Sequence, residues 1–170
     1  ALPHDPVAEH VWASHTGVNV PARATAGYLQ AIFDDFSIDF DAVLAKLQYC
    51  APRILVDRLL QHHPSASRSL DILDAGCGTG LCGPLLRPLA RSLEGVDLSL
   101  GMLEKARLRN VYDDLFQQDL TDFLADRPDQ YDVVLAADTL IYFGELQLPL
   151  AAIATALRPG GLAIFNLEAL

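Results

Sequence analysis

From residue 69 onward, short apolar runs alternate with longer stretches in which apolar residues recur every three or four positions. Near-continuous apolar runs such as VVLAA are typical of strands covered on both faces, and the longer stretches are typical of helices that bury one side. The expected strands cover residues 70–76, 93–98, 114–119, 131–137 and 161–167. The expected helices cover residues 81–91, residues 100–108, a short piece near Phe123, and residues 145–157. Strands that alternate with helices form βαβ units, so we expect a doubly wound, mostly parallel, Rossmann-like α/β sheet.

The first 64 residues show helical periodicity without strand-like runs. Their expected helices cover residues 6–14, a stretch from Pro21 through Phe33, a stretch that follows Ser37 and extends to Leu47, and a stretch that opens at Pro52 and ends before Pro64. The polar residues 64–69 form the clearest linker. We therefore expect an N-terminal helical appendage over residues 1–20, a helical cap over residues 21–64 and a Rossmann-like domain over residues 65–170.

The composition indicates a packed domain and excludes several kinds of partner. The chain has 170 residues, of which 51% are hydrophobic and 20% are charged, and its net charge is −10. An acidic surface repels phosphate backbones, so a nucleic acid is not favoured as a partner. No run approaches the roughly 18 apolar residues that a membrane span needs, so no membrane association is expected.

The three cysteines favour reduced thiols and a cytoplasmic location. Cys50, Cys77 and Cys82 form no CxxC pair and have no histidine at metal-ligand spacing, so no metal site is expected. Cys77 lies between glycines, and no paired base is evident for it. We therefore interpret it as a small side chain packed beneath a turn and not as a nucleophile.

The sequence LDILDAGCGTG places glycines at alternate positions directly after the first expected strand. Gly76, Gly78 and Gly80 let the backbone turn sharply and approach a ligand, and Asp74 stands just before them. The GxGxxG spacing of nicotinamide sites also occurs, starting at Gly78. It begins too far beyond Asp74 for a turn that starts where the strand ends. Since no Tyr is followed four residues later by Lys, a nicotinamide oxidoreductase is the weaker alternative.

Polar side chains also stand at the ends of the later strands, which meet at one edge of a parallel sheet. Asp97 ends the second strand, where a carboxylate can accept hydrogen bonds from both hydroxyls of a ribose. Gln118 and Asp119 follow the third strand, where they can meet an adenine amino group. Asp138 and Tyr142 follow the fourth strand and are the candidate catalytic residues.

Together these segments resemble class I S-adenosylmethionine-dependent methyltransferases. DAGCGTG is similar to their first motif and GVDLS to the acidic end of their second strand, while QQDL, YDVVLAADTLIY and LRPGG resemble their later motifs in the same order. The resemblance covers about residues 65–170 and implies S-adenosyl-L-methionine as the cofactor. The cofactor-binding residues that it implies are Asp74, Ala75, Gly76, Cys77, Gly78, Asp97, Leu98, Met102, Gln118, Asp119, Leu120 and Ala137.

The resemblance also implies where these residues lie along the cofactor. The implied contacts are Asp74, Gly76 and Gly78 around the methionine portion, Asp97 at the ribose, Leu98 and Met102 beside the adenine, Asp119 at its amino group, and Ala137 with Asp138 along the path to the methyl group. Methyl transfer from a sulfonium is an in-line displacement, so the main tasks of the protein are alignment and exclusion of water. The acceptor stays open between a small molecule and a protein side chain.

A second resemblance concerns the segment before the Rossmann-like domain. YLQAIFDDFSIDFDAVLAKLQYCAP is similar to the segment that precedes the catalytic domain in bacterial methyltransferases carrying tetratricopeptide repeats. Members of the class usually continue past the fifth strand with two more strands, and here only nine residues follow Gly161. The final strands are therefore expected to be missing, so that further chain or a second copy in a homodimer would cover the edge of the fifth strand.

Two questions stay open at the level of the sequence. The first is whether the protein is a methyltransferase or a regulatory or scaffold protein that keeps the cofactor pocket without turnover. The second concerns four aromatic residues, which form either a lid over the cofactor or a core face of the cap. These residues are Tyr28, Phe33, Phe36 and Phe40.

Overall fold

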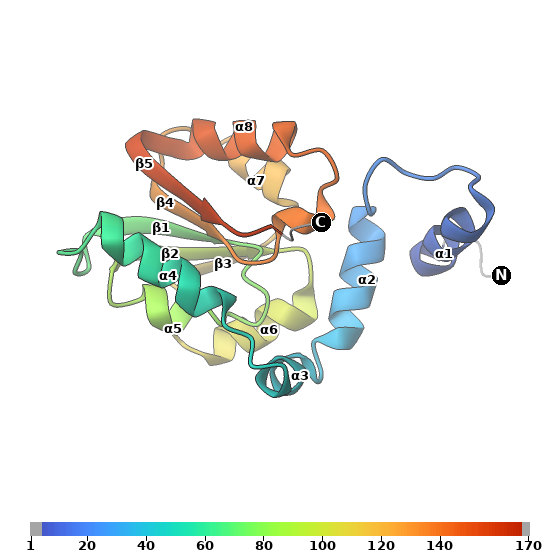
Figure 1. Ribbon diagram of the computed structural model, residues 1–170, viewed down its shortest axis with the longest axis horizontal. Coiled ribbons are helices and arrows are strands. Elements are labelled where there is room, and N and C mark those ends of the chain that lie inside the picture. The colour runs from blue at the N-terminus through green and yellow to red at the C-terminus, as the bar shows by residue number, and fades with distance from the viewer. Residues whose placement is uncertain (1–4, 168–170) are drawn as a thin grey trace.

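The computed structural model describes residues 5–167, so residues 1–4 of the expected appendage and the last three residues of the expected Rossmann-like domain lie outside the described range. Five parallel strands form one sheet in the order β3-β2-β1-β4-β5 (Figure 1). The strands are β1 (Leu70–Ala75), β2 (Ala90–Asp97), β3 (Asp114–Gln117), β4 (Tyr131–Ala136) and β5 (Leu157–Phe165). The strand order reverses between β1 and β4, which confirms the doubly wound α/β fold.

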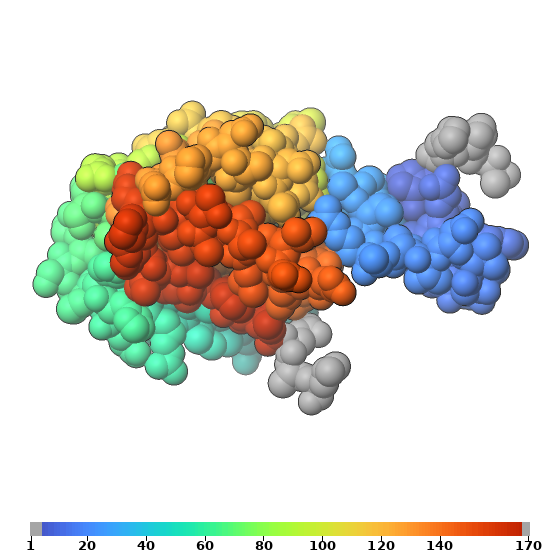
Figure 2. Space-filling model, turned by 90° about the horizontal axis from the view of Figure 1, so that it is seen from above, coloured from blue at the N-terminus to red at the C-terminus, as the bar shows by residue number. Residues whose placement is uncertain are grey.

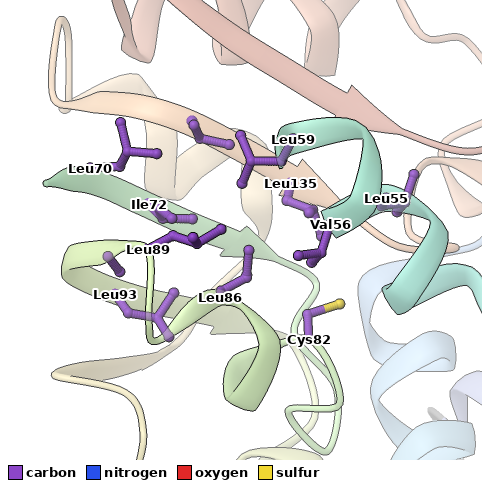
Figure 3. Packing of buried hydrophobic residues seen from close by; sticks show 12 residues of the cluster. Leu55, Val56, Leu59, Leu70, Ile72, Cys82, Leu86, Leu89, Leu93 and Leu135 are labelled. Atoms are coloured by element: carbon purple, nitrogen blue, oxygen red, sulfur yellow. The ribbon is translucent and has the colours of Figure 1, made fainter. Parts of the chain in front are cut away.

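Helices cover both faces of the sheet (Figure 1). On one face lie α4 (Ala51–His62), α5 (Gly83–Leu86) and α6 (Leu100–Leu108), and on the other lie α7 (Leu120–Ala125) and α8 (Gln147–Ala156). Figure 3 shows Leu55, Val56 and Leu59 of α4 packed over Ile72 of β1 and Leu135 of β4. Burial of a leucine side chain of this kind stabilises the fold by roughly 2 kcal/mol, so the two sheet faces supply most of the core. None of the helices in the described range is long and apolar enough to cross a membrane.

Three helices precede α4 and stand beside the carboxyl ends of the strands. They are α1 (Pro6–Thr16), α2 (Ala26–Phe36) and α3 (Phe40–Lys46). Figure 2 shows the dark blue α1 projecting from the body of the molecule, beside α2. Ala13 is the one buried residue of α1, and the ring of His10 stacks on Tyr28 of α2 with 3.8 Å between the ring centroids. Helix α1 therefore extends away from the sheet, whereas α2 and α3 approach it.

One helix start in this segment was wrong in the sequence interpretation. The helix expected to open at Pro21 begins at Ala26, because the side chain of Thr25 accepts a hydrogen bond from the N–H of Tyr28 and caps the first turn. Ser37 precedes the third helix, as expected, but it does not cap it. It ends α2 instead, where its hydroxyl donates to the carbonyl of Asp34.

The expected helix over residues 81–91 was also wrong in its length. The helix α5 has only four residues, and Ala90 already belongs to β2. Pro88 explains the early end, because it has no N–H for the next helical hydrogen bond. The fifth strand starts at Leu157 and not at Gly161, and the register between β4 and β5 shifts where the residues 158–161 bulge out.

Candidate functional site

A cavity of about 390 Å³ opens at the carboxyl ends of the first four strands, where α2 and α3 face the sheet. This volume lies within the range of small-molecule sites. Each site residue expected from the sequence lines the cavity except Ala75. The side chain of Ala75 is buried in the core on the α7 and α8 face, so it does not reach the cavity. The strand ends thus bring together residues that are up to 68 positions apart, from Asp74 to Tyr142.

The turn after β1 contains three glycines with left-handed backbone, of which Gly76 and Gly78 line the cavity. Gly76 has φ of 68° and Gly78 has φ of 54°, a region that side-chain-bearing residues rarely adopt. A Cβ at Gly76 would collide with Thr139, whose hydroxyl donates to the carbonyl of Ala75 at 2.9 Å. A Cβ at Gly78 would meet no protein atom within 4 Å. Gly76 is therefore required for packing, whereas Gly78 leaves its side of the turn open to the cavity.

Two carboxyl groups stand beneath this turn, the buried Asp74 and the half-buried Asp97. Asp97 accepts hydrogen bonds from the N–H of Gly78 at 2.8 Å and from the N–H of Ser99 at 2.9 Å. Asp74 accepts one from the hydroxyl of Tyr112 at 2.6 Å. Burial raises the pKa of Asp74 to about 7 and also raises the pKa of Asp97. The cavity therefore favours a ligand with positive charge or hydrogen-bond donors at this end.

The next part of the cavity wall is apolar, with one ion pair at its rim. Leu98 and Met102 line the cavity, and Met102 is fully buried in the first turn of α6. Asp119 caps α7 by accepting the N–H of Thr121 at 2.8 Å, and it also pairs with Arg23 at 3.1 Å. Gln118 and Leu120 line the cavity on either side of Asp119.

The end of β4 carries a second polar group of the cavity. Asp138 has left-handed backbone with φ of 51°, and its N–H donates to the side chain of Asn166 at 2.9 Å. The amide of Asn166 donates in turn to the carboxylate of Asp138. The ring of Tyr142 lies edge-on against Phe33 of α2, with 5.4 Å between the ring centroids. Both expected catalytic residues therefore line the cavity, and Asp138 is held by the residue that follows β5.

Two neighbouring thiols also line the cavity. Cys77 lies within the glycine turn and Cys82 precedes α5, and both are buried. Burial raises the pKa of each thiol, so both stay protonated at neutral pH. This favours the interpretation of Cys77 as a packing residue. Among the described residues, no group of three or more His, Cys, Asp or Glu side chains could hold a metal ion.

The cap contributes cavity residues that sequence analysis did not assign. Arg23 and Tyr49 line the cavity, and neither stands in a recognisable motif. Phe33, Phe36 and Phe40 line it as well, whereas Tyr28 stacks on His10 away from it. The spacing of the phenylalanines indicated an apolar helix face but not whether it covers the core or a ligand.

Hydrogen bonds fasten the cap to the loops that follow β1 and β2. Asp34 of α2 accepts from the hydroxyl of Ser99 at 2.6 Å and from the N–H of Gly101 at 3.0 Å. Asp41 of α3 accepts from the hydroxyl of Thr79 at 2.5 Å and pairs with Arg109 at 2.6 Å. Carboxylates of α2 and α3 therefore hold the cap against the loops that follow β1 and β2.

Comparisons with known proteins agree on one family. The family model described as "Methyltransferase domain" matches residues 72–161. Methyltransferase-like protein 27 of Homo sapiens is 39% identical over 134 residues, which are 76% of this chain and 54% of that protein. The ubiquinone biosynthesis O-methyltransferase of Chelativorans sp. (strain BNC1) is 34% identical over 97 residues, which are 55% of this chain and 38% of that protein. The chain thus spans 54% or less of the length of these two relatives.

Solved structures show the same likeness. The structure described as the DhpI–SAH complex is similar with a TM-score of 0.65 and 25% sequence identity. The similarity covers 80% of this chain and 65% of that one.

Proposed function

This chain belongs to the methyltransferase domain family, and we propose that it is an S-adenosylmethionine-dependent methyltransferase that binds its methyl donor in the strand-end cavity. The observation that carries the proposal is that the glycine turn, Asp97 and Asp119 all line one cavity. The acceptor is a small molecule or a protein side chain. The family match covers residues 72–161, so the activity is proposed from this part of the chain together with the cavity around it.

The groups around the cavity fit the chemistry of this donor. S-adenosylmethionine carries an ammonium group, a sulfonium, a ribose with two hydroxyls and a flat apolar base. Among the described residues, the charged side chains that line the cavity are Asp74, Asp97, Asp119 and Asp138 against the single cation Arg23. An excess of carboxylates stabilises the two cationic groups, and the open face of Gly78 leaves room for the chain of the amino acid.

The residues of the chain then have separate tasks. Asp97 would accept the ribose hydroxyls with the lone pairs that Gly78 and Ser99 leave free, and Leu98 and Met102 would pack on the adenine. The bound donor supplies a methyl group on a sulfonium, whose sulfur keeps the electron pair of the broken bond. Asp138 lies at the expected methyl end, where its carboxylate can take the proton that a hydroxyl or amine acceptor loses.

Calorimetry with S-adenosylhomocysteine tests this proposal. We expect binding to the wild-type protein, and we expect Asp97→Asn to weaken it about tenfold, since the amide loses charged hydrogen bonds to the ribose. The matched control is Asp113→Asn. Asp113 also accepts a backbone N–H, that of Leu93 at 2.7 Å, but it lies outside the cavity. Absence of binding to the folded wild-type protein would contradict the proposal.

Binding without turnover would support the alternative of a regulatory or scaffold protein. Transfer of a labelled methyl group to any acceptor in a cell extract would exclude that alternative. Three further predictions made from the sequence are part of this proposal. They are the similarity of the cap to methyltransferases with tetratricopeptide repeats, the cytoplasmic location, and a second copy or further strands over β5, which pairs with β4 alone in the described sheet.

A further inference from the structure

Residues from three distant segments meet at the end of the cavity where the methyl group is expected. Tyr49 comes from the connection between α3 and α4, Asp138 follows β4, and Asn166 follows β5. The hydroxyl of Tyr49 lies close to the carboxylate of Asp138, which contributes to the raised pKa of the phenol, and the amide of Asn166 donates to the same carboxylate. Tyr49 and Asp138 both line the cavity. Asp138 is therefore held in place by Asn166, and the pair faces the space where a ligand would lie.

Within residues 5–167, the carboxylate of Asp138 has acceptor capacity left for a ligand. A carboxylate offers about four acceptor positions, and in this range Asn166 donates to that of Asp138 while the hydroxyl of Tyr49 lies close to it. Burial and the carboxylate of Asp138 raise the pKa of Tyr49, so the phenol stays protonated and keeps its own oxygen as an acceptor. The pair can therefore accept hydrogen bonds from one further O–H or N–H group.

The walls around this pair are apolar. Ile141 and Tyr142 follow Asp138 in the short 3-10 helix η1 (Leu140–Tyr142), and Phe33 contacts the ring of Tyr142. No cationic side chain among the described cavity residues is available to pair with an anion here, because Arg23 is bound to Asp119. An anionic group beside Asp138 would meet like charge without compensation.

We propose that Tyr49 and Asp138 form the acceptor-binding pair of this cavity, and that the acceptor is a small molecule whose apolar body carries a hydroxyl or amine and no anionic group. The inference rests on the proposed methyltransferase function. Tyr49 orients the carboxylate of Asp138, and both side chains accept hydrogen bonds from the hydroxyl or amine of the methyl acceptor. The aromatic walls hold the apolar body of that molecule.

Two analogues of the methyl donor test the pair without knowledge of the acceptor. Sinefungin carries an amine where the donor has its methyl group, whereas S-adenosylhomocysteine has neither group. If the pair faces the methyl position, the wild-type protein should bind sinefungin at least about tenfold more tightly than S-adenosylhomocysteine. Tyr49→Phe should reduce this preference about threefold and Asp138→Asn about tenfold, with the affinity for S-adenosylhomocysteine kept within about twofold.

Tyr131→Phe is the matched control, because the hydroxyl of Tyr131 also donates to a carboxylate, that of Glu94 at 2.7 Å, outside the cavity. It should leave the preference for sinefungin unchanged. Equal binding of the two analogues by the wild-type protein, or an unchanged preference in both cavity variants, would overturn the inference. If neither analogue binds, the proposed function itself fails, so the two failures are distinguishable.

The class of acceptor is tested with three matched fragments and the protein saturated with S-adenosylhomocysteine. Benzyl alcohol and benzylamine should raise the unfolding temperature, whereas benzoate should not, because its carboxylate would face Asp138. Tyr49→Phe should reduce the shift given by the first two fragments. A shift with benzoate equal to or larger than those shifts would overturn the assignment of the acceptor class.

Discussion

Asp74 shows how a single residue of the glycine motif couples the site to stability. It is 1% exposed, and burial raises its pKa to about 7, although the hydrogen bond from Tyr112 opposes this. Between the unfolded pKa of 3.8 and the folded pKa, the folded state holds a proton that the unfolded state releases. The stability that this proton contributes is complete below the unfolded pKa and is lost as the pH rises through about 7.

We therefore expect Asp74→Asn to become more stable relative to the wild type as the pH rises from about 5 to about 8, by on the order of 2 kcal/mol. Urea unfolding of both proteins at the two pH values measures this difference. Asp71 in the same strand is the control, since Arg91 lowers its pKa and it stays ionised over the whole interval. The difference between Asp71→Asn and the wild type should stay constant, and equal pH dependence of the two variants would contradict the account.

At the scale of elements, α2 completes the N-terminal cap of α6. Ser99 caps α6 by accepting the N–H of Met102 at 3.1 Å, and its own hydroxyl donates to Asp34 of α2. A Cβ at Gly101 would lie 2.7 Å from the hydroxyl oxygen of Ser37, so the two helices approach closely only because this position is glycine. The start of α6, which carries Met102 into the cavity wall, is thus fixed by a helix of the cap.

Replacement of Asp34 by alanine should lower the free energy of unfolding by about 1–2 kcal/mol, because Ser99 and Gly101 lose a charged acceptor. It should also weaken binding of S-adenosylhomocysteine, because Leu98 and Met102 flank the altered segment. Chemical unfolding and calorimetry measure the two effects. Asp35→Ala, at the exposed neighbouring position, should change neither, and a loss of the same size there would show that Asp34 acts only through general helix stability.

At the scale of the whole molecule, stability is distributed unequally between the sheet and the N-terminal end. The sheet is covered on both faces, whereas α1 buries only Ala13 and packs on α2 (Figure 2). Trp12, the single tryptophan, is 66% exposed on α1. A segment with so little buried apolar surface opens with a low free energy.

Hydrogen exchange should therefore be faster in the amides of α1 than in β1 and β4 by several orders of magnitude, because the central strands open only on global unfolding. Exchange followed by mass spectrometry measures both segments in one experiment. Saturation with S-adenosylhomocysteine should protect α2 and the glycine turn and leave α1 unchanged. Protection of α1 equal to that of the strands would contradict this distribution of stability.

The sequence alone determined the parts of this protein that depend on neighbouring residues. Alternation of buried strands and helices predicted the doubly wound sheet, and the chain direction of parallel strands placed Asp97, Asp119 and Asp138 at one edge. Helix ends were less predictable, because Pro21 and Thr25 both fit a helix start and only the hydrogen bond to Tyr28 decides between them.

Only the tertiary structure decided which side chains of the cap face the cavity and which residues they contact. Arg23 meets Asp119 across 96 residues, and Asp34 meets Ser99 across 65. Tyr49 reaches Asp138 in the same way. Periodicity reports that a helix face is buried, but it carries no information on which distant surface covers it. The partners of these side chains are fixed only when the cap packs against the ends of the strands.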